Sequence, residues 1–198
     1  MSQQFYETDN SRGFVRGYTL LLERSFGPLH HAWGSFSGHP VPWGEDHHRV
    51  MRQRFPHLIR VTVMGEDLPE ERNRVEIDPK LKDTSGIAAP RVVYSYSENS
   101  LKMLEHGSKM ARQSLEAAGA IDILDSGNVT PAYHLMGTAR MGANPRKSVV
   151  NSSNRAHDVE NLYIVDGSSF ATSAAVNPTS TIAALALRAA DRIWQEQK

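Results

Sequence analysis

This chain of 198 residues contains no cysteine, which excludes disulfide bonds, cysteine zinc sites and thiol nucleophiles. Its 22 basic and 22 acidic residues cancel, which argues against a nucleic-acid-binding surface, because such a surface normally carries a basic patch. No apolar run approaches the length that a transmembrane segment requires. These absences, with a hydrophobic content of 39%, predict a soluble globular protein. The sequence does not identify its compartment, and both a cytoplasmic and a periplasmic location stay open.

Glycine patterns that bind phosphate are also missing. No two of the 14 glycines are separated by a single residue, so the Gly-x-Gly-x-x-Gly turn of dinucleotide-binding domains is absent. Neither the Gly-Lys-Ser/Thr of a phosphate loop nor the Gly-x-Ser-x-Gly elbow of a hydrolase occurs. The sequence therefore disfavours a complete nucleotide-binding domain and a serine hydrolase.

The first two thirds of the chain carry the alternating apolar pattern of strands with one solvated face. We predict an antiparallel sheet there. Ser97 or Asn99 can cap a helix that runs to about Ala118 and stops at Gly119, and this helix would cover the sheet. The predicted strands are residues 14–22, 58–63, 73–78 and 91–96.

The last third contains a short apolar run, residues 162–165, that is typical of a strand buried on both faces of a parallel sheet. It ends at Asp166-Gly167. Ligands of open α/β sheets lie beyond the carboxyl ends of the strands, so Asp166 could reach a ribose or ribityl hydroxyl and Gly167 would let the backbone approach a phosphate. Asp-Gly is also a common turn dipeptide, and that alternative stays open.

A helix start follows at Asn177-Pro178, with asparagine as the predicted N-cap and proline at the first helical position. The N–H groups of such a start suit the carbonyl edge of a ring that becomes anionic on reduction, although Asn177 could be a cap and nothing more. The predicted buried face of the helix consists of Ile182, Leu185, Ala186, Ala189 and Ile193.

Two parts of the sequence contain histidines that could serve a functional site. His134 precedes a Gly-Thr pair, and its imidazole could exchange a proton near neutral pH, although a lone histidine is more often structural. A second group, at residues 30–33, 38–43 and 47–48, combines histidine with tryptophan. Its spacing does not favour a metal site, and we expect it to border a substrate entrance where tryptophan could stack on a sugar or another ring.

Taken in order, the motifs of the last third resemble the carboxyl-terminal region of the glucose/methanol/choline family of FAD-dependent oxidoreductases. Three positions depart from the family's usual residues: Asn151 stands for aspartate, Ala156 for valine and Ala171 for proline. The matching motifs are His134-x-x-Gly-Thr-x-Arg-Met-Gly142, Ser148-Val-Val-Asn151, Arg155-Ala-His-Asp-Val159, Asn161-Leu-Tyr-Ile-Val-Asp-Gly-Ser168 and Asn177-Pro-Thr179.

The resemblance implies that His134 accepts the hydroxyl proton of an alcohol or sugar while hydride passes to the flavin N5, and that Asn177 hydrogen-bonds the same oxygen. It implies that Asp166, Gly167 and Ser168 hold the ribityl and pyrophosphate region of FAD. Asn177, Pro178 and Thr179 would lie at the pyrimidine edge of the isoalloxazine. No metal is implied.

The fold class that follows is α+β with an α/β part. Residues 1–130 would form part of a substrate-binding region, an antiparallel sheet with covering helices. Residues 131–198 would supply the terminal strand and helix of a Rossmann-like FAD domain. Since the glycine turn is absent, we expect a carboxyl-terminal fragment whose partner is an amino-terminal FAD-binding region. A non-catalytic remnant and a family lyase without net redox chemistry stay open as alternatives.

Overall fold

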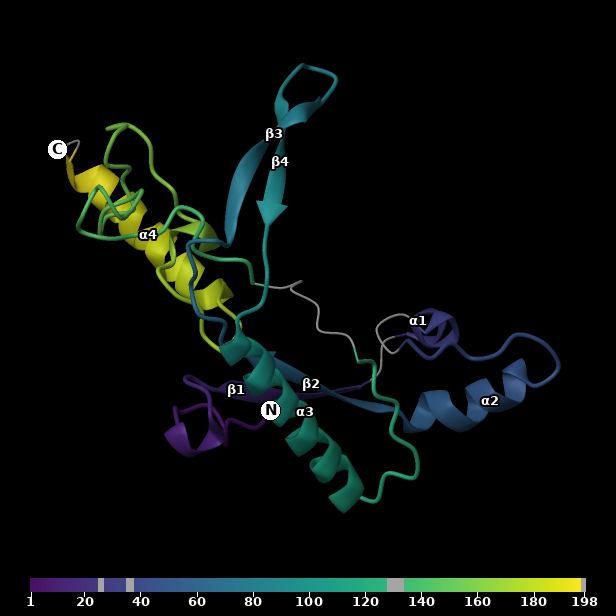
Figure 1. The fold of residues 1–198 in the computed structure, drawn as a ribbon. Coiled ribbons are helices and arrows are strands. Elements are labelled where there is room, and N and C mark those ends of the chain that lie inside the picture. The colour runs from purple at the N-terminus through teal and green to yellow at the C-terminus, as the bar shows by residue number, and fades with distance from the viewer. Residues whose placement is uncertain (25–26, 35–37, 128–133, 197–198) are drawn as a thin grey trace. The chain divides into compact units, whose positions relative to one another are not determined.

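The computed structural model describes residues 1–24, 27–34, 38–127 and 134–196, and Figure 1 traces them. The fold is α+β, with helices and two antiparallel pairs of strands. Internal contacts divide the chain into two compact units, Met1–Gly65 with Leu101–Pro131, and Glu66–Ser100 with Ala132–Lys198. The predicted boundary between residues 130 and 131 separates a substrate-binding region from an FAD-domain segment, and it stays a prediction.

The sheet of the first unit pairs β1 (Tyr18–Arg24) with β2 (Ile59–Gly65), and Tyr18 lies opposite Gly65. β1 begins later than predicted because the chain before it approaches another backbone segment. A Cβ atom at Gly17 would lie 2.0 Å from the Tyr6 carbonyl oxygen, so only glycine fits there. The next amide, that of Tyr18, donates to the Phe5 carbonyl at 3.0 Å.

α3 (Glu98–Ala117) begins and ends where the sequence predicts. The Ser97 hydroxyl accepts from the Ser100 amide at 3.0 Å, which makes Ser97 the N-cap. Gly119 has φ 83°, and the amides of Gly119 and Ala120 donate to the Glu116 and Leu115 carbonyls, which is a Schellman ending.

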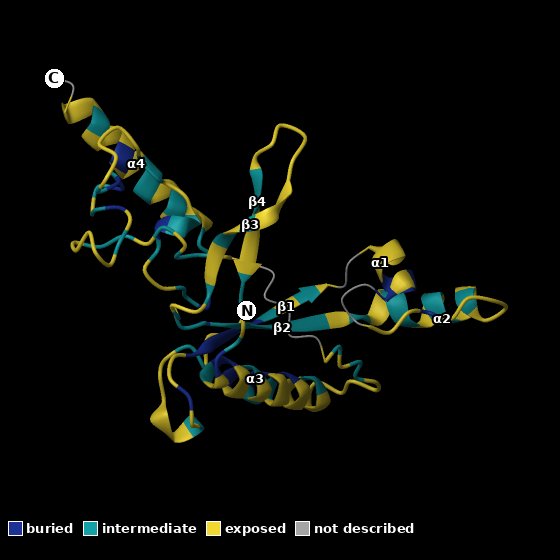
Figure 2. Ribbon diagram, turned by 45° about the horizontal axis from the view of Figure 1, so that its top comes forward, coloured by how far each residue is buried: buried dark blue, intermediate teal, exposed yellow. Residues whose placement is uncertain are grey.

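The sequence predicts an apolar face of α3 made of Leu101, Leu104, Ala111, Leu115 and Ala118. The face that the helix buries agrees with it only in part, because Leu104 and Leu115 are half-buried and Ala118 is exposed. Met103, Gly107 and Ala111 are buried, whereas Leu101 is 49% exposed. The reason is Gly107, where an added Cβ would lie 2.4 Å from a Val63 methyl group, so the missing side chain lets the helix approach β2 closely there. Figure 2 shows the exposed outer face of α3.

The core of this unit joins residues of the amino-terminal segment, β1 and α3. Its buried members are Phe14, Tyr18, Leu20, Met103 and Ala111. Burying one large apolar side chain stabilises a fold by about 1.5–3 kcal/mol, so these few residues hold the sheet and helix together. The Tyr18 hydroxyl lies 2.7 Å from His106 Nδ1, and it donates to that nitrogen when the neutral imidazole carries its proton on Nε2.

The histidine- and tryptophan-rich segment forms two short helices, α1 (Pro28–Trp33) and α2 (His47–Arg54). Single 3-10 turns lie at η1 (Asn10–Arg12) and η2 (Phe55–His57). Among the helices in the described ranges, none combines the length and hydrophobicity that crossing a bilayer demands.

In the second unit, β3 (Arg74–Lys82) and β4 (Ala88–Val93) form an antiparallel hairpin. The antiparallel pairing is as predicted, but the single predicted sheet is wrong, because the part of the chain that the structure describes has two separate pairs of strands. The cause lies in the chain between β2 and β3: the Asp67 carboxylate accepts from the hydroxyls of Tyr94 and Ser100, which anchors the start of the hairpin in the second unit.

The hairpin of β3 and β4 carries exposed apolar side chains on one face, and Figure 2 colours much of its length as exposed. Val75 pairs with Val92 and Ile77 with Pro90, so these four side chains share that face. Val75, Ile77 and Val92 are 48%, 75% and 64% exposed. A hairpin with so little cover depends on its turn, where the Asp83 carboxylate accepts from the amides of Ser85 and Ile87.

The predicted buried strand at residues 162–165 is wrong for this structure. Tyr163 makes an isolated antiparallel bridge with Arg155, and Leu162 and Val165 are 45% and 38% exposed. In the described ranges no strand lies beside the run to complete a parallel sheet, and an apolar run forms a ladder only with such neighbours.

The predicted helix, by contrast, is α4 (Thr179–Glu196). The five residues predicted for its buried face are the ones that are buried or half-buried, and every other described position of α4 is exposed. The helical periodicity was therefore sufficient to identify this face.

Stability should depend on pH through His106. Burial, together with the cations of Arg12 and Lys109, lowers the pKa of its imidazole, whereas the unfolded imidazole titrates near about 6.5. Between those two pKa values the unfolded state binds more protons, so the free energy of unfolding should decrease as the pH falls below about 6.5. Urea unfolding followed by near-ultraviolet circular dichroism at pH 8 and pH 5 measures this.

The matched control is His106→Gln, whose amide can still accept from Tyr18 but does not titrate. We expect a smaller loss of stability between the two pH values in this variant. Equal losses in the two proteins would show that His106 is not the responsible group.

Candidate functional site

The segment after His134 is bound to the Asp166 region by backbone hydrogen bonds. The amides of Gly137, Ala139 and Met141 donate to the carbonyls of Gly167, Ser168 and Ser169 at 3.3, 2.9 and 2.8 Å, respectively. Those three carbonyls belong to a 3-10 turn, η3 (Gly167–Ser169). Two predicted motifs thus lie side by side although about 30 residues separate them in the chain.

Asp166 is the N-cap of η3. Its Oδ1 accepts from the Ser168 amide at 2.8 Å and from the Ser168 hydroxyl. The hydroxyl, followed by the amide, lowers the pKa of Asp166 and keeps the carboxylate ionised. Asp166 is exposed, and no hydrogen bond to its Oδ2 occurs within the described ranges, so this second oxygen is available to a ligand hydroxyl.

Gly167 is the point at which the predicted site segments converge. An added Cβ there would lie 3.4 Å from the Leu135 carbonyl oxygen, 3.5 Å from Met136 Cγ and 3.6 Å from Ile182 Cδ1. Leu135 follows His134, and Ile182 belongs to the first turn of α4, just after Asn177. These separations are ordinary van der Waals contacts, and the φ of Gly167 is not left-handed, so the packing does not demand glycine here.

His134 is exposed and has φ 60°, in the left-handed region. A non-glycine residue in that region is uncommon, and such conformations concentrate at functional sites. The backbone conformation therefore distinguishes His134 from an ordinary surface histidine.

At the α4 start, the structure shifts the predicted cap by one residue. The helix begins at Thr179, and the Pro178 carbonyl accepts from the Ile182 amide at 3.0 Å. Pro178, not Asn177, occupies the cap position, because the carbonyl of the cap residue accepts the first helical bond. Asn177 is exposed, and within the described ranges no hydrogen bond joins it to His134.

A four-residue turn, Asn151-Ser-Ser-Asn154, was not predicted to matter. Asn151 Oδ1 accepts from the amides of Ser153 and Arg155 at 2.9 and 3.2 Å, bonds that an aspartate would accept equally. This explains how asparagine can replace the family's usual aspartate at that position. Asn154 and Ser169 are both buried. The signal available in the sequence was the pair of asparagines around two serines, a composition typical of a turn.

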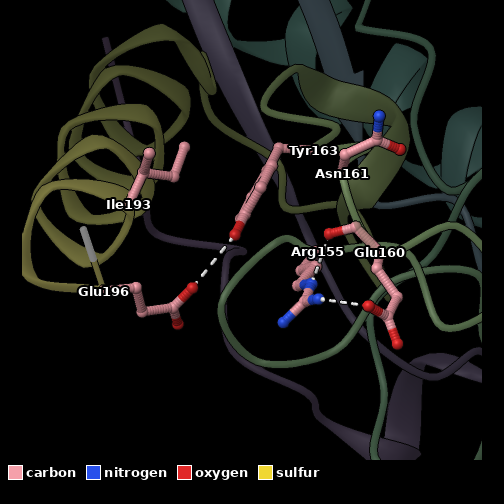
Figure 3. A pocket seen from close by; sticks show the side chains of 6 residues that line it. All are labelled: Arg155, Glu160, Asn161, Tyr163, Ile193 and Glu196. Atoms are coloured by element: carbon pink, nitrogen blue, oxygen red, sulfur yellow. Dashed lines mark hydrogen bonds and ion pairs between the residues drawn. The ribbon is translucent and has the colours of Figure 1, made fainter.

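A surface hollow of about 450 Å³ lies beside α4, as Figure 3 shows. Four of its polar side chains are already paired with one another: Arg155 with the Glu160 carboxylate at 3.6 Å, and the Tyr163 hydroxyl with Glu196 at 3.3 Å. Asn161 and Ile193 complete the lining, and none of the predicted site residues contributes.

In the histidine- and tryptophan-rich segment, the Trp43 ring stacks on His47 with centroids 4.5 Å apart, and Trp33 and Trp43 are exposed. The predicted role beside a substrate entrance stays a prediction, and residues 35–37 lie outside the described ranges. Across the described residues, no three potential ligands among His, Cys, Asp and Glu are placed to hold a metal ion.

Comparison with known proteins gives consistent matches. A family model described as GMC oxidoreductase matches residues 69–186. The 2-methyl-1,2-propanediol dehydrogenase of Mycolicibacterium austroafricanum is 46% identical over 194 residues, 97% of this chain and 35% of that protein. The fructose dehydrogenase large subunit of Gluconobacter japonicus is 36% identical over 148 residues, 75% of this chain and 27% of its own length. The chain thus spans about a third or less of these relatives.

Glycine-to-alanine substitutions can test whether packing requires a glycine at position 167. Gly167→Ala places a methyl group at ordinary contact distances, so its melting temperature should stay within about 2 °C of the unmodified chain. Gly137→Ala is the matched control: Gly137 has φ 85°, where a Cβ costs about 1–2 kcal/mol. Thermal unfolding measures both, and a Gly167→Ala loss as large as that of Gly137→Ala would show that packing itself requires Gly167.

Proposed function

Since this chain belongs to the GMC oxidoreductase family, we propose that it is the carboxyl-terminal part of an FAD-dependent enzyme that oxidises a CH–OH group of an alcohol or sugar. The convergence of the His134 segment, η3 and the first turn of α4 on Gly167 is the observation that carries the proposal. The names of the relatives, a diol dehydrogenase and a fructose dehydrogenase, agree with this class of substrate.

The residues around Gly167 fit one side of an FAD site. Asp166 offers a carboxylate oxygen to a ribityl hydroxyl. Gly167 lets a phosphate approach the backbone, and the packing around it does not itself require a glycine. Ser168 fixes the Asp166 carboxylate through its hydroxyl and amide. Asn177, Pro178 and Thr179 stand at the amino-terminal end of α4, whose unpaired N–H groups favour negative charge.

His134 and Asn177 would act on the substrate hydroxyl. The imidazole of His134 accepts the hydroxyl proton, and the amide of Asn177 donates to the same oxygen, which orients the C–H bond for hydride departure. When bound, FAD supplies the hydride acceptor at N5. Within the described ranges no hydrogen bond joins the side chains of His134 and Asn177 to each other. Asn177 is not the cap of α4, because Pro178 occupies that position.

The exposed apolar run at residues 162–165 supports the proposed place of this segment in a larger domain. Leu162 and Val165 are half-exposed here, and strands on either side would cover them in a Rossmann-like sheet, with α4 as its terminal helix. On this proposal residues 131–198 form the FAD-domain segment and residues 1–130 part of the substrate-binding region. The remaining FAD contacts come from an amino-terminal region.

The isolated chain should bind FAD weakly or not at all, because Asp166, Gly167 and the α4 start supply one side of a dinucleotide site. Titration of FAD with the purified chain, followed by flavin fluorescence, measures this directly. Stoichiometric binding with a submicromolar Kd would show that a second region is not required.

The proton acceptor can be tested in a hybrid enzyme in which residues 1–198 replace the matching segment of the 2-methyl-1,2-propanediol dehydrogenase. His134→Ala should slow reduction of the bound flavin by that diol by about 10²–10⁴, because proton acceptance is lost, while flavin content is retained. Anaerobic stopped-flow absorbance measures the rate at saturating substrate. His57→Ala, at an exposed histidine outside the site, is the matched control and should reduce normally.

Asn177→Ala in the same hybrid should also slow reduction, and its melting temperature should hardly change because Asn177 is not the cap.

Normal reduction in the His134→Ala hybrid would overturn the assignment of the base. A flavin-bound hybrid with residues 1–198 that never reduces would favour a non-catalytic remnant.

A further inference from the structure

Asn154 is completely buried and lies at the end of the Asn151-Ser-Ser-Asn154 turn. Its φ of 62° is left-handed, a conformation that asparagine tolerates better than most side chains. Its carbonyl accepts from the Ile164 amide at 2.9 Å, so the turn is joined to the residues that lead into Asp166.

The side-chain amide of Asn154 bonds to the chain on both sides of Asp166. Nδ2 donates to the Ile164 carbonyl at 2.9 Å, two residues before Asp166, and to the Ser169 hydroxyl at 3.3 Å, three residues after it. Oδ1 accepts from Arg188 of α4 at 3.4 Å, and the same guanidinium nitrogen donates to the Ser152 carbonyl. One buried amide thereby joins the turn, the Asp166 loop and α4.

The second partner, Ser169, transmits this contact to Asp166. The Ser169 hydroxyl accepts from Asn154 and uses its own proton to donate to the Asp166 carbonyl at 3.0 Å. The Ser169 amide donates to the same carbonyl at 3.2 Å. The backbone position of Asp166 is thus fixed by a chain of bonds that starts at a residue with no access to solvent or ligand.

We infer that Asn154 is a positioning residue for the FAD site, acting through Ile164 and Ser169 to hold the Asp166 loop in its binding geometry. The inference rests on the proposed function, because it gives a role to the loop that the proposal assigns to FAD. Asn154 does not touch the cofactor in this account. Its loss would leave the Ile164 carbonyl and the Ser169 hydroxyl without their buried partner, and the loop would relax toward other arrangements.

The test uses the hybrid enzyme described above and the variant Asn154→Gly, which keeps the left-handed backbone while deleting the side-chain bonds. We expect its Kd for FAD to rise about tenfold and the visible circular dichroism of its bound flavin to change, since each lost buried hydrogen bond weakens the loop geometry. Ser169→Ala deletes one link of the same chain with a smaller change of volume. Ser169→Ala should also weaken FAD binding. If Asn154→Gly does not fold, Ser169→Ala is the variant that tests the inference.

Ser97→Ala is the matched control, because it removes the N-cap of α3 and lowers the melting temperature without altering the Asp166 loop. Asn154→Gly and Ser169→Ala could bind FAD as tightly as Ser97→Ala does, at a comparable loss of melting temperature. That result would show that Asn154 has only a general structural role. An unmodified hybrid that binds no FAD would instead overturn the proposed function and, with it, this inference. The two failures are therefore distinguishable.

Discussion

Three backbone hydrogen bonds, from Gly137, Ala139 and Met141 to the carbonyls of η3, are the constraint on which the candidate site depends. They use alternate amides of one short segment to engage successive carbonyls of a tight turn. Backbone bonds of this kind are insensitive to side-chain identity, so the segments stay paired while the residues beside them are free to vary. His134 and Asp166, the positions to which the proposed function gives chemical roles, lie at the edges of this pairing and are exposed.

Asp166 and Gly167 differ in how this arrangement holds them. Cap bonds hold one carboxylate oxygen of Asp166, while the other accepts no hydrogen bond within the described ranges. Gly167 lies where three segments meet at ordinary contact distances. The backbone of the turn is held by these hydrogen bonds, while the Asp166 side chain is exposed.

Features set by neighbouring residues could be predicted from the sequence, and features set by distant ones could not. The cap and stop of α3 and the buried face of α4 depend on residues within a few positions, and these predictions were confirmed. Residues 162–165 show the opposite case, because an apolar run becomes a strand only when other strands lie beside it. Asn154 was missed because its partners stand 10 to 34 residues away. The candidate-site residues came from a family resemblance, and the convergence on Gly167 was not visible in any local pattern.

The β3–β4 hairpin has a practical consequence. It presents Val75, Ile77 and Val92 to water, and each of its two strands has an edge without a partner within the hairpin. Open strand edges beside an apolar face are templates on which other chains add, so molecules of this chain at high concentration would associate through them. Purification and storage of the isolated polypeptide therefore call for dilute solutions, and a charged residue at Ile77, the most exposed of the three, is the rational solubilising change.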